Sequence, residues 1–189
     1  GFNFTVSDGT DTLAGSQAFV INVTNAAPTL PPNVALAVDE GATEIIDNTL
    51  LQAVDADDGP AELTFTLTSI PDNGTLYLGT TALGLNDTFT QADINAGDLS
   101  YTHDSSNSTL DGFNFTVSDG TDALVEGAQL FDITVAPVND APTLTINAAL
   151  NVDEGATATI TNSQLLVEDV DNTADQLVFT ITTAPSNGT

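Results

Sequence analysis

The sequence contains no lysine and no arginine, although 27 of its 189 residues are aspartate or glutamate. The formal net charge at pH 7 is -27, and only one histidine is present that could offset any of it. Such a surface repels nucleic acid and anionic lipid, which argues against both as partners. Repulsion between carboxylates also destabilises a compact state, so the folded chain needs an outside cation.

Cysteine and tryptophan are absent as well, and there are only two tyrosines. Without cysteine the chain has no disulfide, no thiolate metal site and no thiol nucleophile. Without tryptophan it has little with which to stack on sugar rings, which disfavours a carbohydrate-binding module. No apolar run approaches the roughly 20 residues that cross a bilayer, so we expect no membrane span in this segment.

What the chain does have is a repeat. Residues Pro28–Thr75 align without a gap onto Pro142–Thr189 at an offset of 114 (142 minus 28), with 25 of 48 positions identical. Residues Gly1–Asp11 and Gly112–Asp122 both read GFNFTVSDGTD. We predict the C-terminal part of a first repeat at 1–27, a complete repeat at 28–141 and the N-terminal part of a third at 142–189. This pattern is expected of a segment from a longer tandem array.

Hydrophobic and polar residues alternate within each unit. Leu63–Thr68 (LTFTLT) and Leu177–Thr182 (LVFTIT) place large apolar residues on one face, and the same alternation occurs at 113–117 and 131–135. This period predicts half-buried antiparallel strands. We interpret Pro71–Thr75 (PDNGT) as an Asn-Gly hairpin. One short helical turn is expected at residues 90–97, capped by Thr90 and ended by Gly97.

Many short strands separated by turns, without cysteine, indicate an all-β chain. The expected fold is a series of tandem Greek-key β-sandwiches of the cadherin or immunoglobulin kind, with about seven strands per repeat and minimal helix.

The acidic residues gather in the turns. The D-x-D pair Asp55/Asp57 recurs as Asp169/Asp171, the pair Asp39-Glu40 recurs as Asp153-Glu154, and Asn139-Asp140 lies just before the third unit. Alternate carboxylates in a bent loop point at one ion, and hard oxygen ligands favour Ca2+. We therefore predict that these turns bind Ca2+. An acidic surface screened only by bulk salt is the alternative interpretation.

Two stretches of the complete unit carry a family resemblance. FTQADINAGDLSYTHD (Phe89–Asp104), followed by DGFNFTVSDG (Asp111–Gly120), resembles the cadherin-like repeats of the NG2/chondroitin sulfate proteoglycan (CSPG) type, which also form long arrays in bacterial surface adhesins. The first half of the unit, with VDEGA and LLQAVDADDGPAELTFTL, is similar to cadherins themselves. The resemblance implies β-sandwiches joined by ion clusters, several ions in all and chiefly at the junctions between repeats.

The resemblance also implies which residues hold the ions. It assigns Glu40 to the acidic turn, Asp55 and Asp57 to the D-x-D loop, and Asn139 with Asp140 to the linker. The later junction then combines Glu40, Asn139, Asp140, Asp169 and Asp171, and Asp39, Asp153 and Glu154 are further candidates.

At the earlier junction Ala26 stands where the later linker has Asp140, and the linker is two residues shorter. We therefore expect weaker or fewer ions there. The aspartates of the two SDGTD turns, which are Asp8, Asp11, Asp119 and Asp122, rank below the junction residues because hairpin geometry alone explains them.

No residues form a recognisable catalytic arrangement, and we expect no enzyme activity. His103, next to Asp104, is interpreted as a hydrogen-bonded residue at a strand end. The expected function is that of an extracellular, cell-surface or secreted segment, a Ca2+-rigidified stalk or spacer of an adhesin whose partners are neighbouring repeats of the same chain. The alternative is a subunit of a self-assembling extracellular filament or matrix, formed by homotypic contacts of the same repeats.

Overall fold

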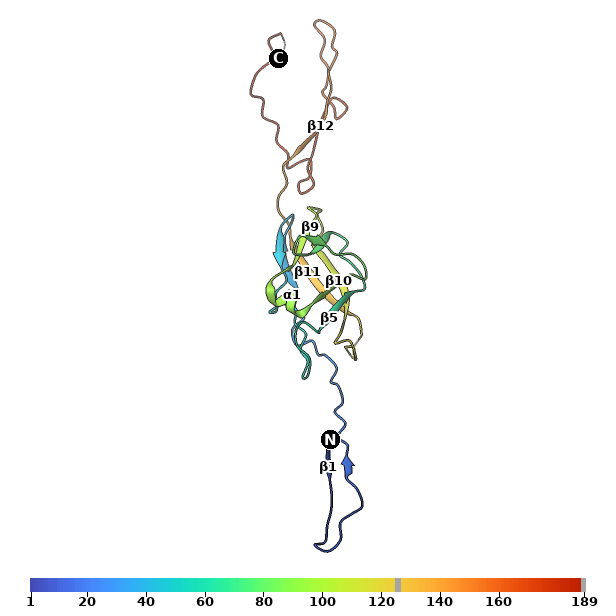
Figure 1. The fold of residues 1–189 in the computed structure, drawn as a ribbon. Coiled ribbons are helices and arrows are strands. Elements are labelled where there is room, and N and C mark those ends of the chain that lie inside the picture. The colour runs from blue at the N-terminus through green and yellow to red at the C-terminus, as the bar shows by residue number, and fades with distance from the viewer. Residues whose placement is uncertain (125–126, 188–189) are drawn as a thin grey trace.

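The computed structural model describes residues 1–124 and 127–187, and it has three parts in a row (Figure 1). The N-terminal part is a two-stranded hairpin of β1 (Phe2–Phe4) and β2 (Gln17–Phe19). A β-sandwich forms the middle. The C-terminal part contains the strand pair β12 (Thr143–Asn147) and β13 (Leu165–Glu168). Residues 188 and 189 of the predicted third unit lie outside the described residues.

The sandwich consists of a five-stranded sheet in the order β3-β11-β10-β5-β8 and a four-stranded sheet in the order β4-β9-β6-β7. β3 pairs with β11 in parallel, and the other pairs are antiparallel. The strands are β3 (Leu36–Asp39), β4 (Thr43–Ile45), β5 (Thr64–Leu67), β6 (Gly74–Leu78), β7 (Thr81–Ala82), β8 (Thr88–Thr90), β9 (Leu99–His103), β10 (Leu110–Ser118) and β11 (Gln129–Ala136). The all-β sandwich that the sequence predicts is confirmed. Among the described residues the sandwich has more strands than the seven predicted. The prediction missed β7 and β8 because they are too short to show an alternation in the sequence.

The core lies between the two sheets and follows the predicted alternation. Phe65 in β5, Phe113 and Phe115 in β10, and Phe131 in β11 are all fully buried. The rings of Phe65 and Phe89 stack with their centroids 5.0 Å apart. Each of these side chains contributes about 1.5 to 3 kcal/mol by burial, as do the buried leucine, isoleucine and valine side chains packed with them.

The one helix in the described residues is α1 (Gln91–Ala96), as the sequence predicts. Thr90 is its N-cap and forms a capping box with Asp93, and Gly97 ends the helix in the left-handed conformation. These are local hydrogen bonds, which is why the sequence alone identifies them.

The prediction of an Asn-Gly hairpin at Pro71–Thr75 is wrong. The segment leads from β5 in one sheet to β6 in the other, and β5 does not pair with β6. Gly74 is required for another reason, since a Cβ at that position would lie 2.5 Å from the ring of Tyr101. The glycine therefore allows β6 to pass close to a buried aromatic side chain.

The terminal parts repeat the sequence of the sandwich without its packing. Phe2 pairs with Phe19 as Phe113 pairs with Phe131, but Phe2 is 57% exposed whereas Phe113 is 0% exposed. The strand predicted at 177–182 is not formed, and Phe179 is exposed. In the complete unit the matching strand β5 lies between β10 and β8, and a strand without neighbours has no partners for its backbone hydrogen bonds.

Candidate metal centres at the two junctions

The earlier junction is built around the D-x-D loop that precedes β5. The backbone N–H groups of Asp57 and Asp58 donate to Asp55 Oδ1, at 2.9 and 3.3 Å. This turn draws one carboxylate oxygen each from Asp55, Asp57 and Asp58 to within 4.8 Å of one another. Asp55 Oδ2 is buried and has no hydrogen-bond partner among the described residues. A buried, unpaired carboxylate oxygen is unfavourable unless a cation neutralises it.

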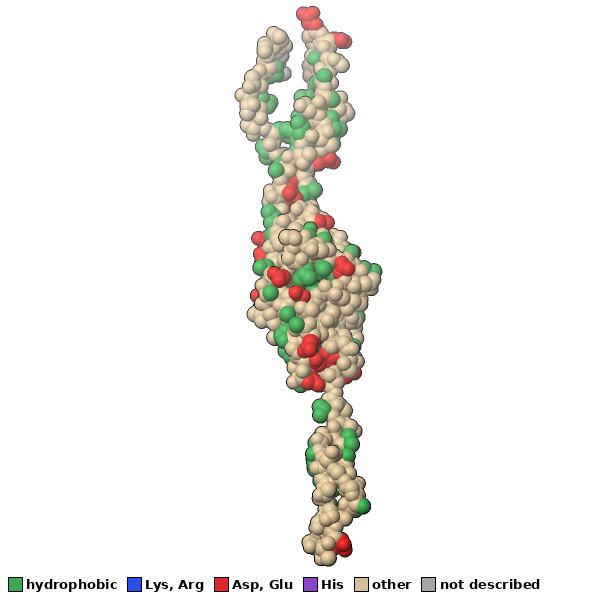
Figure 2. Space-filling model, viewed as in Figure 1, with side chains coloured by type: hydrophobic (Ala, Val, Ile, Leu, Met, Phe, Trp, Pro, Cys, Tyr) green, Lys and Arg blue, Asp and Glu red, His purple; other side chains and the backbone are tan. Residues whose placement is uncertain are grey.

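The carboxylates of this loop lie close together, and their pKa values reflect this crowding, burial and local hydrogen bonds. Burial, followed by repulsion from the carboxylates of Glu62 and Asp119, raises the pKa of Asp58 above its usual value. The pKa of Asp55 is lowered instead, chiefly because the N–H of Asp57 stabilises its ionised form. Figure 2 shows acidic side chains gathered at the end of the sandwich that faces the N-terminal part.

The linker and the second SDGTD turn complete this end of the sandwich. The N–H of Ala26 donates to Asp57 Oδ1 at 3.2 Å. The side-chain amide of Asn25 donates to Asp119 Oδ2 at 2.8 Å and to Asp122 Oδ2 at 3.3 Å. Two of the four aspartates that the sequence ranks below the junction residues, Asp119 and Asp122, therefore contact the linker of a junction.

Strand pairing explains why the sequence did not reveal this proximity. The end of β10 lies beside the start of β5, with Ser118 opposite Thr64. The SDGTD turn follows β10 and the D-x-D loop precedes β5, so the pairing brings them to the same end of the sandwich. No local sequence pattern reports a contact between residues so far apart in the chain.

The later junction joins Glu40, the linker and the D-x-D loop of the third unit. Glu40 Oε2 accepts the N–H of Val138 at 3.1 Å, and Asp171 Oδ2 accepts the N–H of Asp140 at 2.6 Å. Asp169 Oδ1 accepts the N–H groups of Asp171 and Asn172, both at 2.9 Å. Glu40 Oε1 and Asp169 Oδ2 are buried and unpaired among the described residues. Both junctions thus contain carboxylate oxygens that no donor among the described residues satisfies.

The two junctions differ at one position of the loop. Asp58 at the earlier junction corresponds to Asn172 at the later one. The Asn172 amide donates to Asp169 Oδ1 at 3.1 Å and to Asn139 Oδ1 at 3.3 Å, and it is the main cause of the lowered pKa of Asp169. The cluster of three carboxylates is therefore at the earlier junction, where the sequence predicts weaker or fewer ions. That prediction stays untested, but the geometry favours the opposite.

Three predicted ligands stand apart from these clusters. Asp39 is exposed at the end of β3, and Asp153 and Glu154 are exposed in the matching turn of the third unit. Among the described residues, none of the three side chains hydrogen-bonds to another predicted ligand. The structure therefore brings Asp55 and Asp57 together at one junction. At the other, Asp140 contacts Asp171 and Asn139 contacts Asn172 in the loop that contains Asp169, whereas Glu40 contacts the linker at Val138.

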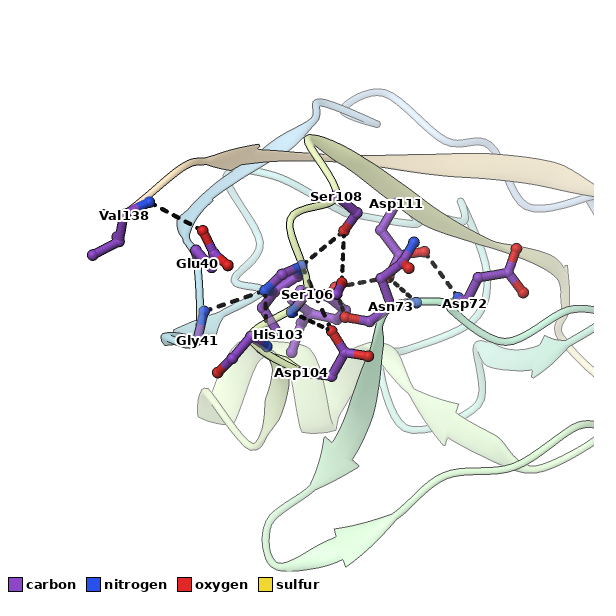
Figure 3. Close-up of polar contacts among 12 residues, drawn as sticks. Glu40, Gly41, Asp72, Asn73, His103, Asp104, Ser106, Ser108, Asp111 and Val138 are labelled. Carbon is purple, nitrogen blue, oxygen red and sulfur yellow. Dashed lines mark hydrogen bonds and ion pairs between the residues drawn. The ribbon is translucent and has the colours of Figure 1, made fainter. Parts of the chain in front are cut away.

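A further polar cluster lies inside the complete unit (Figure 3). Asp111 accepts four hydrogen bonds: Oδ1 from the N–H groups of Asp72 and Gly112, at 2.9 and 2.8 Å, and Oδ2 from the N–H of Asn73 and the hydroxyl of Tyr101, at 3.0 and 2.7 Å. His103 is buried nearby and hydrogen-bonded at the end of β9, as the sequence predicts. Through these hydrogen bonds, Asp111 and His103 hold strands and loops of the sandwich together.

Comparison with known proteins agrees with this architecture. A family described as Cadherin-like matches residues 28–135 and 142–189. The extracellular matrix organizing protein FRAS1 of Mus musculus is 36% identical over 192 residues, which cover 100% of this chain and 5% of that protein. FRAS1-related extracellular matrix protein 1 of Homo sapiens is 32% identical over 201 residues, 99% of this chain and 9% of that protein.

The chondroitin sulfate proteoglycan 4 of Rattus norvegicus is 29% identical over 194 residues, 93% of this chain and 8% of that protein. The chain therefore spans less than a tenth of the length of each of these three relatives. The match to chondroitin sulfate proteoglycan 4 supports the CSPG-type repeat. All three relatives are mammalian proteins, so they lend no support to a bacterial adhesin. The short helix α1 of the described residues cannot cross a membrane.

Proposed function

This chain belongs to the cadherin-like family, and on that premise we propose that it is a non-enzymatic segment of a long extracellular matrix protein. In this proposal the units 1–27, 28–141 and 142–189 are successive repeats that form a spacer. The matches at 28–135 and 142–189 support these divisions. The names of two relatives, which are extracellular matrix proteins, support the extracellular setting.

The finer part of the proposal is that Ca2+ stiffens the junctions. One observation carries it: Asp55 Oδ2, Glu40 Oε1 and Asp169 Oδ2 are buried and unpaired among the described residues, and all three belong to the junctions. The chain has no lysine or arginine to neutralise them. An all-oxygen donor set of carboxylates, backbone carbonyls and amide oxygens suits Ca2+ better than a transition metal.

Each junction would use its own residues to hold the ion. At the earlier junction, Asp55, Asp57 and Asp58 would bind it, while Asn25 and Ala26 tie the linker to the same end of the sandwich. At the later junction, Glu40 and Asp169 would provide their unpaired carboxylate oxygens. Without the cation these carboxylates would repel one another at the junction, whereas with it they would hold two units in one orientation.

Thermal unfolding with and without Ca2+ tests this proposal. Ca2+ at about 100 times its dissociation constant should stabilise the chain by about 2.7 kcal/mol per site, which corresponds to a rise in Tm of about 10 °C. The variant with Asp55, Asp57 and Asp58 changed to asparagine should lose the part of that rise that comes from the earlier junction. Asp98→Asn is the matched control, because Asp98 is exposed and lies outside both junctions. An unchanged Tm in EDTA would rule out the Ca2+ spacer.

Small-angle scattering separates the spacer from the filament alternative. A spacer should remain monomeric as protein concentration rises, and its maximum dimension should increase when Ca2+ straightens the junctions. A self-assembling filament should instead show a molecular mass that grows with protein concentration.

A further inference from the structure

His103 is buried at the end of β9, and both ring nitrogens have partners (Figure 3). Nδ1 accepts the N–H groups of Gly41 at 3.2 Å and Ser105 at 3.3 Å. An acceptor carries no hydrogen, so the proton of the neutral ring is on Nε2, which lies 2.9 Å from Ser108 Oγ. Asp104 Oδ1 lies 4.0 Å from the same nitrogen. These contacts determine both the tautomer and the orientation of the ring.

His103 holds the Asp39–Ala42 turn at two points. Its backbone N–H donates to the carbonyl of Ala42 at 3.0 Å, and its ring accepts the N–H of Gly41. Gly41 has a φ of +70°, and a Cβ there would lie 2.7 Å from Ser105 Oγ. The turn therefore packs directly against the loop that follows β9.

Glu40 is the residue that this turn presents to the linker. Its backbone N–H donates to the carbonyl of Ala136 at 2.9 Å. Its Oε2 accepts the N–H of Val138 at 3.1 Å, and its Oε1 is buried and unpaired among the described residues. The orientation of the turn thus decides where the Glu40 carboxylate lies relative to the linker.

The third unit provides an internal comparison. Its turn closes with a bond from Ala156 to Asp153 at 2.9 Å, where the complete unit has 3.0 Å, and Gly155 has a φ of +77°. No atom lies within 4 Å of a Cβ placed on Gly155, and Glu154 is exposed. Local sequence is therefore enough to form the turn, and the contacts with His103 and Ser105 attach it to the sandwich.

We propose that His103 is the positioning residue of the later junction: it holds Gly41 so that Glu40 reaches the linker. His103 itself contacts neither the linker nor the proposed ion. The proposal rests on the proposed function for the role of Glu40 as an ion ligand. The hydrogen bond between Glu40 and Val138 is present without an ion, so the positioning role can be measured separately.

Two variants separate the roles of the two ring nitrogens. His103→Asn places an acceptor near the position of Nδ1, whereas His103→Gln places its amide nearer the position of Nε2. Amide hydrogen exchange of Gly41 and Val138, measured by NMR on the full chain in EDTA, is the readout. We expect His103→Gln to accelerate the hydrogen exchange of both amides by about tenfold, which is the effect of losing one hydrogen bond of typical strength. His103→Asn and the control Ser108→Ala should leave Val138 protected.

If His103→Gln accelerates the amide exchange of Gly41 but leaves Val138 protected, His103 only stabilises the core and does not position Glu40. That result would overturn the proposal. If His103→Gln does not fold, Gly41→Ala displaces the turn from its own side. Gly155→Ala is then the matched control, because it introduces the same backbone strain at a positive φ but no steric clash with a neighbouring side chain. Gly41→Ala should expose Val138 and Gly155→Ala should not; equal behaviour of the two would also overturn the proposal.

Calorimetric titration with Ca2+ then connects the positioning role to the proposed function. It is carried out with Asp55, Asp57 and Asp58 changed to asparagine, so that the later junction dominates. His103→Gln should weaken Ca2+ binding as much as Glu40→Gln does, and the double variant should be no weaker than Glu40→Gln. Absence of Ca2+ binding before any change to His103 would refute the proposed ion, while the exchange of Val138 would still decide the role of His103.

Discussion

Replacing Asp111 with alanine should destabilise the sandwich by about 3 kcal/mol. The carboxylate accepts three backbone N–H groups and the hydroxyl of Tyr101. Hydrogen bonds to a charged group contribute about 1.5 to 3 kcal/mol each, but two factors reduce the sum. The Tyr101 hydroxyl has a second acceptor, the carbonyl of Asn73 at 3.2 Å, and water reaches part of the loop that contains Asp72 and Asn73.

Urea denaturation followed by circular dichroism measures this loss. Asp111→Asn keeps the shape and one acceptor oxygen, so its loss of stability should be intermediate. Asp132→Ala is the matched control, because Asp132 lies opposite Gly112 on β11 and is exposed; it should change stability by less than about 0.5 kcal/mol. Equal midpoints for Asp111→Ala and Asp132→Ala would show that the Asp111 carboxylate does not hold the loop.

Three other predictions concern neighbouring features. Burial and the bond to Asp111 raise the pKa of Tyr101, so above about pH 10 the unfolded state loses its phenol proton first and stability should fall as pH rises; Tyr101→Phe should flatten that slope in denaturant titrations. Because burial, and after it repulsion from neighbouring carboxylates, raises the pKa of Asp58, Asp58→Asn should raise Tm in EDTA at pH 7 and weaken Ca2+ binding. If Tm in EDTA and Ca2+ affinity instead both rose or both fell, the metal site would be contradicted. Gly74→Ala should cost about 1 to 3 kcal/mol by overpacking Tyr101, whereas Gly84→Ala, whose Cβ would meet its nearest neighbour at 3.6 Å, should cost less in the same denaturation assay.

The geometry of the candidate metal centres was predictable only in part. The D-x-D loops could be predicted from local sequence, because Asp55 and Asp169 each accept the N–H of the residue two positions further along the chain. The linker contacts follow from the repeat boundaries. The contact of Asp119 and Asp122 with Asn25 could not be predicted from the sequence, because it depends on the pairing of β10 with β5 and therefore on residues far apart in the chain.

The sequence by itself determined the local turns. SDGTD has the same hydrogen bonds at both of its occurrences: Asp8 Oδ1 accepts two N–H groups at 2.9 and 2.8 Å, and Asp119 Oδ1 accepts the equivalent two at 2.7 Å each. One copy is attached to a complete sandwich and the other to an isolated hairpin. The turn is the same in both because all of its bonds lie within four residues.

Only the tertiary structure decided what those turns and strands do. Phe2 and Phe113 have identical neighbours in sequence, yet one is 57% exposed and the other is 0% exposed, since burial requires the facing sheet. The same difference separates Glu154, which is exposed, from Glu40, whose Oε2 accepts the N–H of Val138 in the linker. Burial and site geometry come from segments distant in the chain, whose contacts form only when the whole unit is present.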